Sequence, residues 1–147
     1  MCVNKKLISL EALIQEYFEQ MIQALESSIE FNVLAHFEYG LRMIDISIIE
    51  FDNLASKFLN KIIELIVKKE IAFEVNTKSI YRYKKENLYS YMIEKYLKKG
   101  GKLFTLGSDA HNIKDYAYKF DEATKFLLSK KIKEIILFKD KIKMEKI

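Results

Sequence analysis

The chain has 147 residues, of which half are hydrophobic and 31% are charged, with 25 Lys and Arg against 21 Asp and Glu. This composition is typical of one globular domain with a single core and excludes an intrinsically disordered chain. The net charge of +4 is spread along the sequence, so it argues against nucleic-acid binding. The single cysteine, Cys2, and the lack of an apolar run of about 18 residues favour a cytoplasmic protein without disulfides or a membrane span.

Helices and short strands alternate along the sequence. Apolar residues three and four positions apart predict the helices, and short continuous apolar runs predict the strands. In chain order the predicted elements are a helix (7–28), a strand (31–36), a loop (37–52), a helix (53–69), a strand (71–75), a polar loop (78–87), a helix (88–98), a strand (102–106), a helix (119–130), a strand (134–138) and a charged tail. This alternation predicts one α/β domain over 1–147 with parallel strands.

Polar side chains follow the predicted strands at the point where each strand ends. His36 ends the first strand, Glu74 and Asn76 end the second, and Asp109 and His111 end the third. Because the carboxyl ends of parallel strands meet at one face, we expect these side chains to converge there. Imidazole and carboxylate groups suit zinc, iron and manganese, so the pattern predicts a metal site. Taken singly, His36 is also compatible with a structural hydrogen bond, and Asp109 or Ser108 with a helix cap.

Two arginines lie in the loops that come after these strands. Arg42 comes six residues after His36, and Arg82 six residues after Asn76. A guanidinium group binds phosphate through two parallel hydrogen bonds, so either arginine is a candidate for phosphate recognition. The alternative for each is a solvated surface arginine.

Three sequence blocks resemble the polymerase and histidinol phosphatase (PHP) superfamily, and within it the PHP-type histidinol-phosphatases. They are Leu34–Arg42 (LAHFEYGLR), Phe73–Thr77 (FEVNT) and Gly100–His111 (GGKLFTLGSDAH). The Gly-Ser-Asp-Ala-His sequence at the end of the third block is the most specific part. The resemblance covers about residues 10 to 140 in order and spacing.

This resemblance implies a distorted (β/α)7 TIM-like barrel that holds up to three divalent metal ions, Zn, Mn or Fe. It implies hydrolysis of L-histidinol phosphate, a small-molecule phosphate ester, in histidine biosynthesis. Carried over by position, the metal ligands are His36, Asp109 and His111, and either Asp109 or His111 is the catalytic proton donor. The residues expected to bind or line the substrate phosphate are Arg42, Arg82, Asn76 and Ser108.

The sequence departs from the family in its metal-binding motifs. The family site begins with an N-terminal His-x-His, whereas the two histidines of this chain are His36 and His111. A TIM-like barrel needs roughly 250 residues, so the resemblance predicts the C-terminal half of the barrel, a single partial domain with an incomplete metal cluster. We expect such a chain to be weakly active or inactive alone, and to associate as a homodimer or with a separate N-terminal half. The alternatives are a non-catalytic assembly subunit and a PHP-type phosphoesterase acting on nucleotides.

Overall fold

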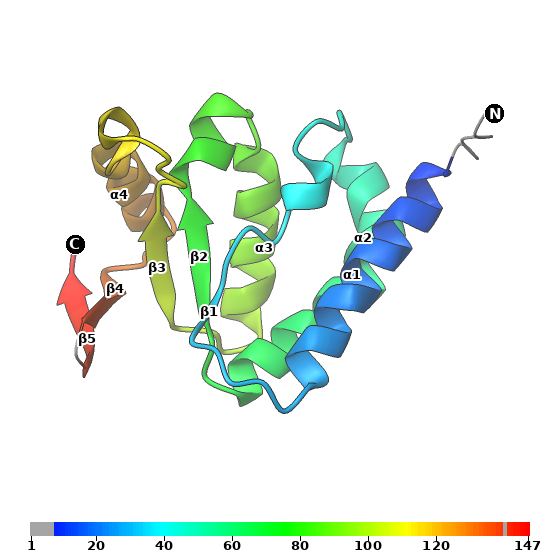
Figure 1. The fold of residues 1–147 in the computed structure, drawn as a ribbon, viewed down its shortest axis with the longest axis horizontal. Helices are drawn as coiled ribbons and strands as arrows, with labels where there is room; N and C mark the ends of the chain where they lie inside the picture. The colour runs from blue at the N-terminus through cyan, green and yellow to red at the C-terminus, as the bar shows by residue number, and fades with distance from the viewer. Residues whose placement is uncertain (1–7, 140) are drawn as a thin grey trace.

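The structure is a computed structural model that describes residues 8–139 and 141–147. Its elements alternate between helix and strand as far as α4 (Figure 1). In chain order they are α1 (Leu10–Glu26), β1 (Val33–Leu34), α2 (Ile48–Lys68), β2 (Ala72–Asn76), α3 (Glu86–Lys98), β3 (Phe104–Gly107), α4 (Phe120–Ser129), β4 (Glu134–Lys139) and β5 (Lys141–Lys146). Short helical turns lie at Tyr39–Leu41, Lys78–Arg82 and Ile113–Asp115.

The first three strands form a parallel sheet in the order β1-β2-β3. Val33 of β1 lies opposite Ala72 of β2, and Phe73 of β2 lies opposite Phe104 of β3. The predicted α/β class with parallel strands is therefore confirmed for these three strands. All three run in one direction, so their carboxyl ends share one edge of the sheet.

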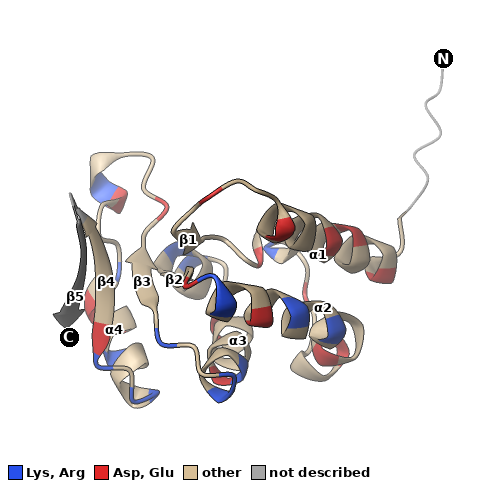
Figure 2. Ribbon diagram, turned by 90° about the horizontal axis from the view of Figure 1, so that it is seen from below, with Lys and Arg blue, Asp and Glu red and all other residues tan. Residues whose placement is uncertain are grey.

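A cluster of aromatic side chains joins the sheet to α3. Phe73 is fully buried, and its ring lies 6.1 Å from that of Tyr89 and 6.0 Å from that of Tyr96, both on α3. Figures 1 and 2 show α3 on one face of the sheet, and among the described residues no helix lies directly over the other face. The sheet is thus covered on one side and open on the other.

The second helix begins earlier than the sequence predicts. The hydroxyl of Ser47 accepts a hydrogen bond from the backbone N–H of Glu50 at 3.2 Å, which caps α2 at Ile48. Serine at this position satisfies a backbone N–H that the first helical turn leaves free. The prediction of a loop over 37–52 is therefore wrong for its last residues, because the apolar period alone does not register the cap.

The fourth predicted strand does not extend the parallel sheet. β4 pairs with β5 in an antiparallel, two-stranded sheet, with Glu134 opposite Lys146 and Phe138 opposite Ile142. The prediction of a fourth parallel strand is wrong here, and most of the predicted charged tail forms the strand β5. Residues 141–146 read KIKMEK, an alternation of charged and apolar residues that is typical of a strand with one solvated face. The larger barrel remains a prediction, since the described parallel sheet has three strands. No helix of the described residues is both long and apolar enough to cross a membrane.

Candidate functional site

The residues after β1 and β3 turn sharply and point their side chains toward the same edge of the sheet. His36 follows β1 by two residues and has a backbone φ of 52°, and Asp109 follows β3 by two residues with a φ of 50°. Both values lie in the left-handed region, which residues other than glycine seldom adopt. The two side chains approach each other, with 3.9 Å between His36 Nε2 and Asp109 Oδ1.

Arg42 lies at the centre of this cluster and contacts four of its members. Its Nη1 donates to Asp109 Oδ2 at 3.0 Å, and its Nη2 lies 3.0 Å from His36 Nδ1. Its Nε donates to Glu38 Oε1 at 3.2 Å and to Ser79 Oγ at 3.1 Å. The guanidinium group therefore connects the loop after β1 with the segments that come after β2 and β3.

The Arg42 side chain is almost completely enclosed, with 7% of its surface exposed. The rings of Tyr39 and Tyr83 cover it, with centroids 4.8 and 5.1 Å from the guanidinium carbon. Burial by itself lowers the pKa of Arg42, but the hydrogen bond to Asp109 and the charge of Glu38 raise it above its usual value. Arg42 therefore stays charged in the folded protein.

Glu38 holds Arg42 through a buried ion pair. Its side chain is fully buried, and Oε2 accepts a hydrogen bond from the Tyr89 hydroxyl at 2.6 Å while Oε1 faces Arg42. Burial and the charge of Glu38 raise the pKa of Tyr89 well above its usual value, so the phenol keeps its proton and donates. A carboxylate removed from water needs such partners, because an unpaired buried charge is strongly destabilising.

Asp109 is shared between two cations. Besides Arg42, Lys78 lies with its Nζ 3.4 Å from Asp109 Oδ2 and donates to the Asp109 backbone carbonyl at 3.1 Å. Burial alone would raise the pKa of Asp109, but the hydrogen bond from Arg42 and the neighbouring positive charges lower it below its usual value. Asp109 is therefore a carboxylate rather than an acid at neutral pH.

His36 has one ring nitrogen engaged and one directed toward Asp109. Its Nδ1 faces two donors, the Asn76 amide nitrogen at 3.2 Å and Arg42 at 3.0 Å. Because both partners donate, the neutral ring carries its hydrogen on Nε2. The Asn76 amide also donates to Glu74 Oε1 at 3.0 Å. The same amide nitrogen therefore links the His36 ring to the Glu74 carboxylate.

The remaining predicted site residues lie at the margin of the cluster or outside its contacts. His111 is 74% exposed, and its Nδ1 lies 2.9 Å from the Asp109 carbonyl. The Arg82 side chain is 44% exposed and forms an ion pair with Asp115 at 2.9 Å. Ser108 is partly exposed, and its hydroxyl makes no hydrogen bond within the described part of the chain. The structure thus brings His36, Arg42, Asn76 and Asp109 together but leaves Arg82 and Ser108 outside their contacts.

Sequence reasoning misses two residues that the structure places in the cluster. Lys78 falls in the predicted polar loop, although its place two residues after Asn76 puts it at the same sheet edge. Glu38 has the four-residue spacing from Arg42 that suits an ion pair on one helical turn, and this spacing is a usable sequence signal. Its partner Tyr89 is 51 positions further along the chain, and no local signal links the two.

The cluster does not by itself fit a metal ion. Over residues 8–139 and 141–147, no three His, Cys, Asp or Glu side chains lie close enough together to hold one. Asp109, the carboxylate predicted as a ligand, already faces Arg42 and Lys78. Since a catalytic zinc usually has three protein ligands, a complete metal centre needs donors beyond those of the described residues.

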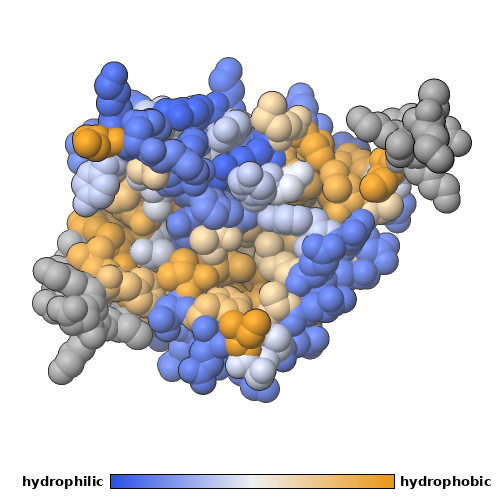
Figure 3. Space-filling model, in the orientation of Figure 1, coloured by the Kyte–Doolittle hydropathy of each residue, from blue (hydrophilic) through white to orange (hydrophobic). Residues whose placement is uncertain are grey.

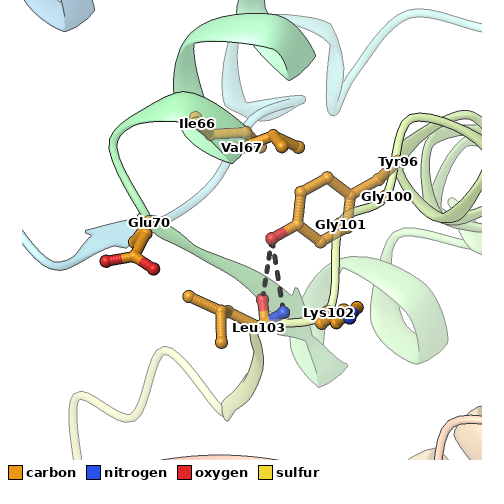
Figure 4. Close-up of a pocket in the computed structure, with 8 residues that line it drawn as sticks. All are labelled: Ile66, Val67, Glu70, Tyr96, Gly100, Gly101, Lys102 and Leu103. Carbon is orange, nitrogen blue, oxygen red and sulfur yellow. Dashed lines mark hydrogen bonds between the residues drawn. The ribbon is translucent and has the colours of Figure 1, made fainter.

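A separate hollow lies at the opposite, amino end of the strands. It has a volume of about 200 Å³ and is bordered by the end of α2 and by the Gly100–Leu103 segment. Figure 4 shows the Tyr96 hydroxyl bonded to both the backbone N–H and the carbonyl of Leu103, at 3.4 Å each. Only two charged side chains, Glu70 and Lys102, line it, and no described cluster of titratable groups faces it, so the strand-end cluster is the candidate site.

The fold is similar to about half of a known phosphatase structure. A histidinol phosphate phosphatase from Lactococcus lactis, solved in complex with zinc, L-histidinol and phosphate, superposes with a TM-score of 0.75 at 23% sequence identity. The match covers 94% of this chain and 53% of that chain. At this level of identity the similarity shows the fold alone.

Sequence comparison leads to the same group of proteins. The probable histidinol-phosphatase of Thermotoga maritima is 32% identical over 102 residues, which are 69% of this chain and 41% of that protein. The corresponding protein of Clostridium acetobutylicum is 28% identical over 125 residues, 84% of this chain and 49% of the relative. The histidinol-phosphatase of Lactococcus lactis is 31% identical over 100 residues, 66% of this chain and 36% of the relative. The chain is a partial match to the histidinol-phosphatases.

The extent of these matches is limited. The chain spans about half the length, or less, of the curated relatives it matches. No family model matches the chain.

Proposed function

We propose that this chain forms part of a PHP-type phosphatase that hydrolyses L-histidinol phosphate to L-histidinol and phosphate. The observation that carries the proposal is the Arg42 cluster, which joins His36 and Asp109 at the carboxyl ends of the strands. Partial matches to curated histidinol-phosphatases support it, as does a neighbouring structure complexed with L-histidinol and phosphate. The barrel implied by that family is the proposed context for the three-stranded sheet.

The side chains of the cluster suit the parts of a phosphate ester. Nη1 and Nη2 of Arg42 each carry two hydrogens, and each has one partner among the described residues. We propose that a phosphate oxygen accepts the remaining N–H groups where 7% of the Arg42 side chain is exposed. Lys78 adds a third cationic donor. Asp109 and His111 are the proposed proton donors to the leaving oxygen, and the low pKa of Asp109 favours His111 for that role. Asn76, Ser108 and Arg82 are proposed to line the substrate from the rim.

Divalent metal ions belong to this proposal only with ligands from outside the described residues. We propose that His36, Asp109 and His111 contribute to sites for Zn, Mn or Fe, in keeping with the zinc in the neighbouring structure. Two cations already lie within 3.4 Å of Asp109, and they oppose the approach of another positive ion. Weak metal binding by the isolated chain is the consequence.

The test is a titration of the labelled chain with L-histidinol phosphate, followed by amide resonances, together with phosphate release in the presence of Mn²⁺ or Zn²⁺. We expect the ester to shift the amides of Gly107 and Asp109 and to be hydrolysed slowly, with both effects reduced about tenfold in Lys78→Met, because a charged hydrogen bond is lost. The matched control is Lys114→Met, which changes an exposed lysine in the short helical turn at Ile113–Asp115.

Two other results would contradict the proposal, and each would favour a different function. Nucleoside monophosphates that shift the same amides at lower concentration would identify a phosphoesterase acting on nucleotides. An absence of binding to any phosphate ester would leave a non-catalytic assembly subunit.

We also propose that the open face of the sheet is covered by a second copy of the chain or by a separate half of the barrel. Figure 3 shows hydrophobic residues gathered over the middle and lower part of this face. Val33 in β1 and Leu103 next to β3 are only partly buried. Exposed apolar surface next to sheet edges promotes association. We expect light scattering after size-exclusion chromatography to give a dimer mass at micromolar concentration. A monomer throughout that range would exclude the homodimer.

A further inference from the structure

Glu74 is the one site carboxylate that the proposed mechanism does not use. It lies in the middle of β2, between Phe73 and Val75, whose side chains are fully buried. Since side chains alternate across a strand, Glu74 points to the opposite face, the open face of the sheet seen at the front in Figure 1. Its side chain is 13% exposed, so it lies within the sheet face rather than in bulk water.

The other two carboxylates of the cluster have cationic partners, whereas Glu74 does not. Glu38 pairs with Arg42, and Asp109 pairs with Arg42 and Lys78. Among the described lysines and arginines none forms an ion pair with Glu74, whose nearest basic atom is His36 Nδ1 at 3.8 Å. That nitrogen already accepts from two donors, so it offers Glu74 no proton. The cluster therefore holds one uncompensated negative charge on the open face.

The two oxygens of Glu74 differ in their surroundings. Oε1 accepts from the Asn76 amide at 3.0 Å and from the backbone N–H of His36 at 3.4 Å. Oε2 lies over Gly107, where an added Cβ would come within 2.1 Å of it. Gly107 thus leaves the space that this oxygen occupies, and among the described residues Oε2 has no hydrogen-bond donor. A fixed carboxylate with one oxygen free is suited to bind a cation.

We propose that Glu74 binds the ammonium group of the substrate and so makes the site selective for phosphate esters of amino alcohols. This inference rests on the proposed function, because the cationic donors Arg42 and Lys78 would hold the phosphate end of the same molecule. An ammonium group needs one carboxylate and a few neutral acceptors, whereas a metal ion needs a set of ligands that the described residues do not assemble here. L-histidinol carries this ammonium group next to its hydroxymethyl carbon, which places the two charges of its phosphate ester close together.

The experiment compares two alcohols that differ only in the amino group. The labelled chain is titrated with L-histidinol and with 3-(imidazol-4-yl)propan-1-ol, and shifts are followed at the amides of Gly107 and Asn76. We expect L-histidinol to bind about tenfold more tightly, the usual effect of a charge-assisted hydrogen bond. In Glu74→Gln, which keeps the shape and the acceptor for His36, the two alcohols should bind equally, while inorganic phosphate binds no more weakly than before.

Glu64→Gln on α2, an exposed glutamate paired with Lys99, is the matched control and should keep the preference for L-histidinol. Thermal unfolding of each variant shows whether the fold is retained, and the comparison of the two alcohols on the unmodified chain needs no variant at all. Equal binding of both alcohols by the unmodified chain would overturn the inference. The inference would also be overturned if Zn²⁺ alone shifted the amide resonances of Gly107 and Asn76 in the unmodified chain but not in Glu74→Gln, since Glu74 would then be a metal ligand. If inorganic phosphate and L-histidinol phosphate still bind in either case, the proposed function stands; if neither binds, the proposed function itself fails.

Discussion

Replacement of Arg42 by methionine should lower the free energy of unfolding by about 3–5 kcal/mol, the cost of removing one partner from a buried ion pair. The reason is Glu38, which is fully buried and whose carboxylate would keep, among the described residues, only the Tyr89 hydroxyl as a partner. The Asp109 carboxylate would lose its shortest hydrogen bond as well, leaving Lys78 as its cation among the described residues. Because a domain of this size is stable by about 5–15 kcal/mol, the variant should show a markedly lower urea midpoint by circular dichroism.

Arg82→Met is the matched control for this change. Both arginines are predicted from the sequence to bind phosphate, but the Arg82 side chain is 44% exposed, and its ion pair among the described residues is with Asp115. Because water screens such an exposed pair, its loss should leave the urea midpoint nearly unchanged. The double variant Glu38→Gln with Arg42→Met should recover part of the lost stability, since the uncompensated buried charge is then absent. Equal unfolding midpoints for the Arg42 and Arg82 variants would show that the cluster does not support the fold.

The positions of the site residues along the chain are predictable, whereas their contacts are not. Each predicted ligand follows a strand, and in a parallel sheet this alone places His36, Asn76 and Asp109 at one edge. Residues at the carboxyl ends of parallel strands must lie at the same end of the sheet, so the positions of the strands in the sequence are sufficient to bring these side chains together. The two arginines have equivalent places in the sequence, yet Arg42 is enclosed by Tyr39 and Tyr83 while Arg82 turns toward Asp115. Such a difference depends on side chains that come together only in the folded chain.

Pairing between strands is the other feature that local sequence does not determine. An apolar run such as Ile135–Phe138 suits a parallel and an antiparallel neighbour equally well, and the choice depends on the next segment of the chain. Here the KIKMEK segment comes too soon after β4 for a crossover and pairs with it directly.

Phe73→Ala should cause a loss of stability similar to that of the Arg42 variant, about 3–5 kcal/mol, because it opens a cavity in the most densely aromatic part of the core. The Phe73 ring is fully buried and lies 5.4 Å from that of Phe37 and 6.4 Å from that of Phe104. Phe138→Ala removes the same atoms from a side chain that is 40% exposed, and it should cost well under half as much. The measurement is urea unfolding of both variants beside the unmodified chain.

The Phe73 variant also tests how the core supports the site. Its ring contacts that of Tyr89, whose hydroxyl holds Glu38 and, through Glu38, Arg42. If the aromatic cluster positions the arginine, Phe73→Ala should shift the amide resonances of Asp109 and weaken phosphate binding even where the protein remains folded, while Phe138→Ala leaves both unchanged. A Phe73 variant that is destabilised but binds phosphate with unchanged affinity would show that Arg42 is held by its own ion pairs. The core would then contribute to the stability of the domain but not to the geometry of its site.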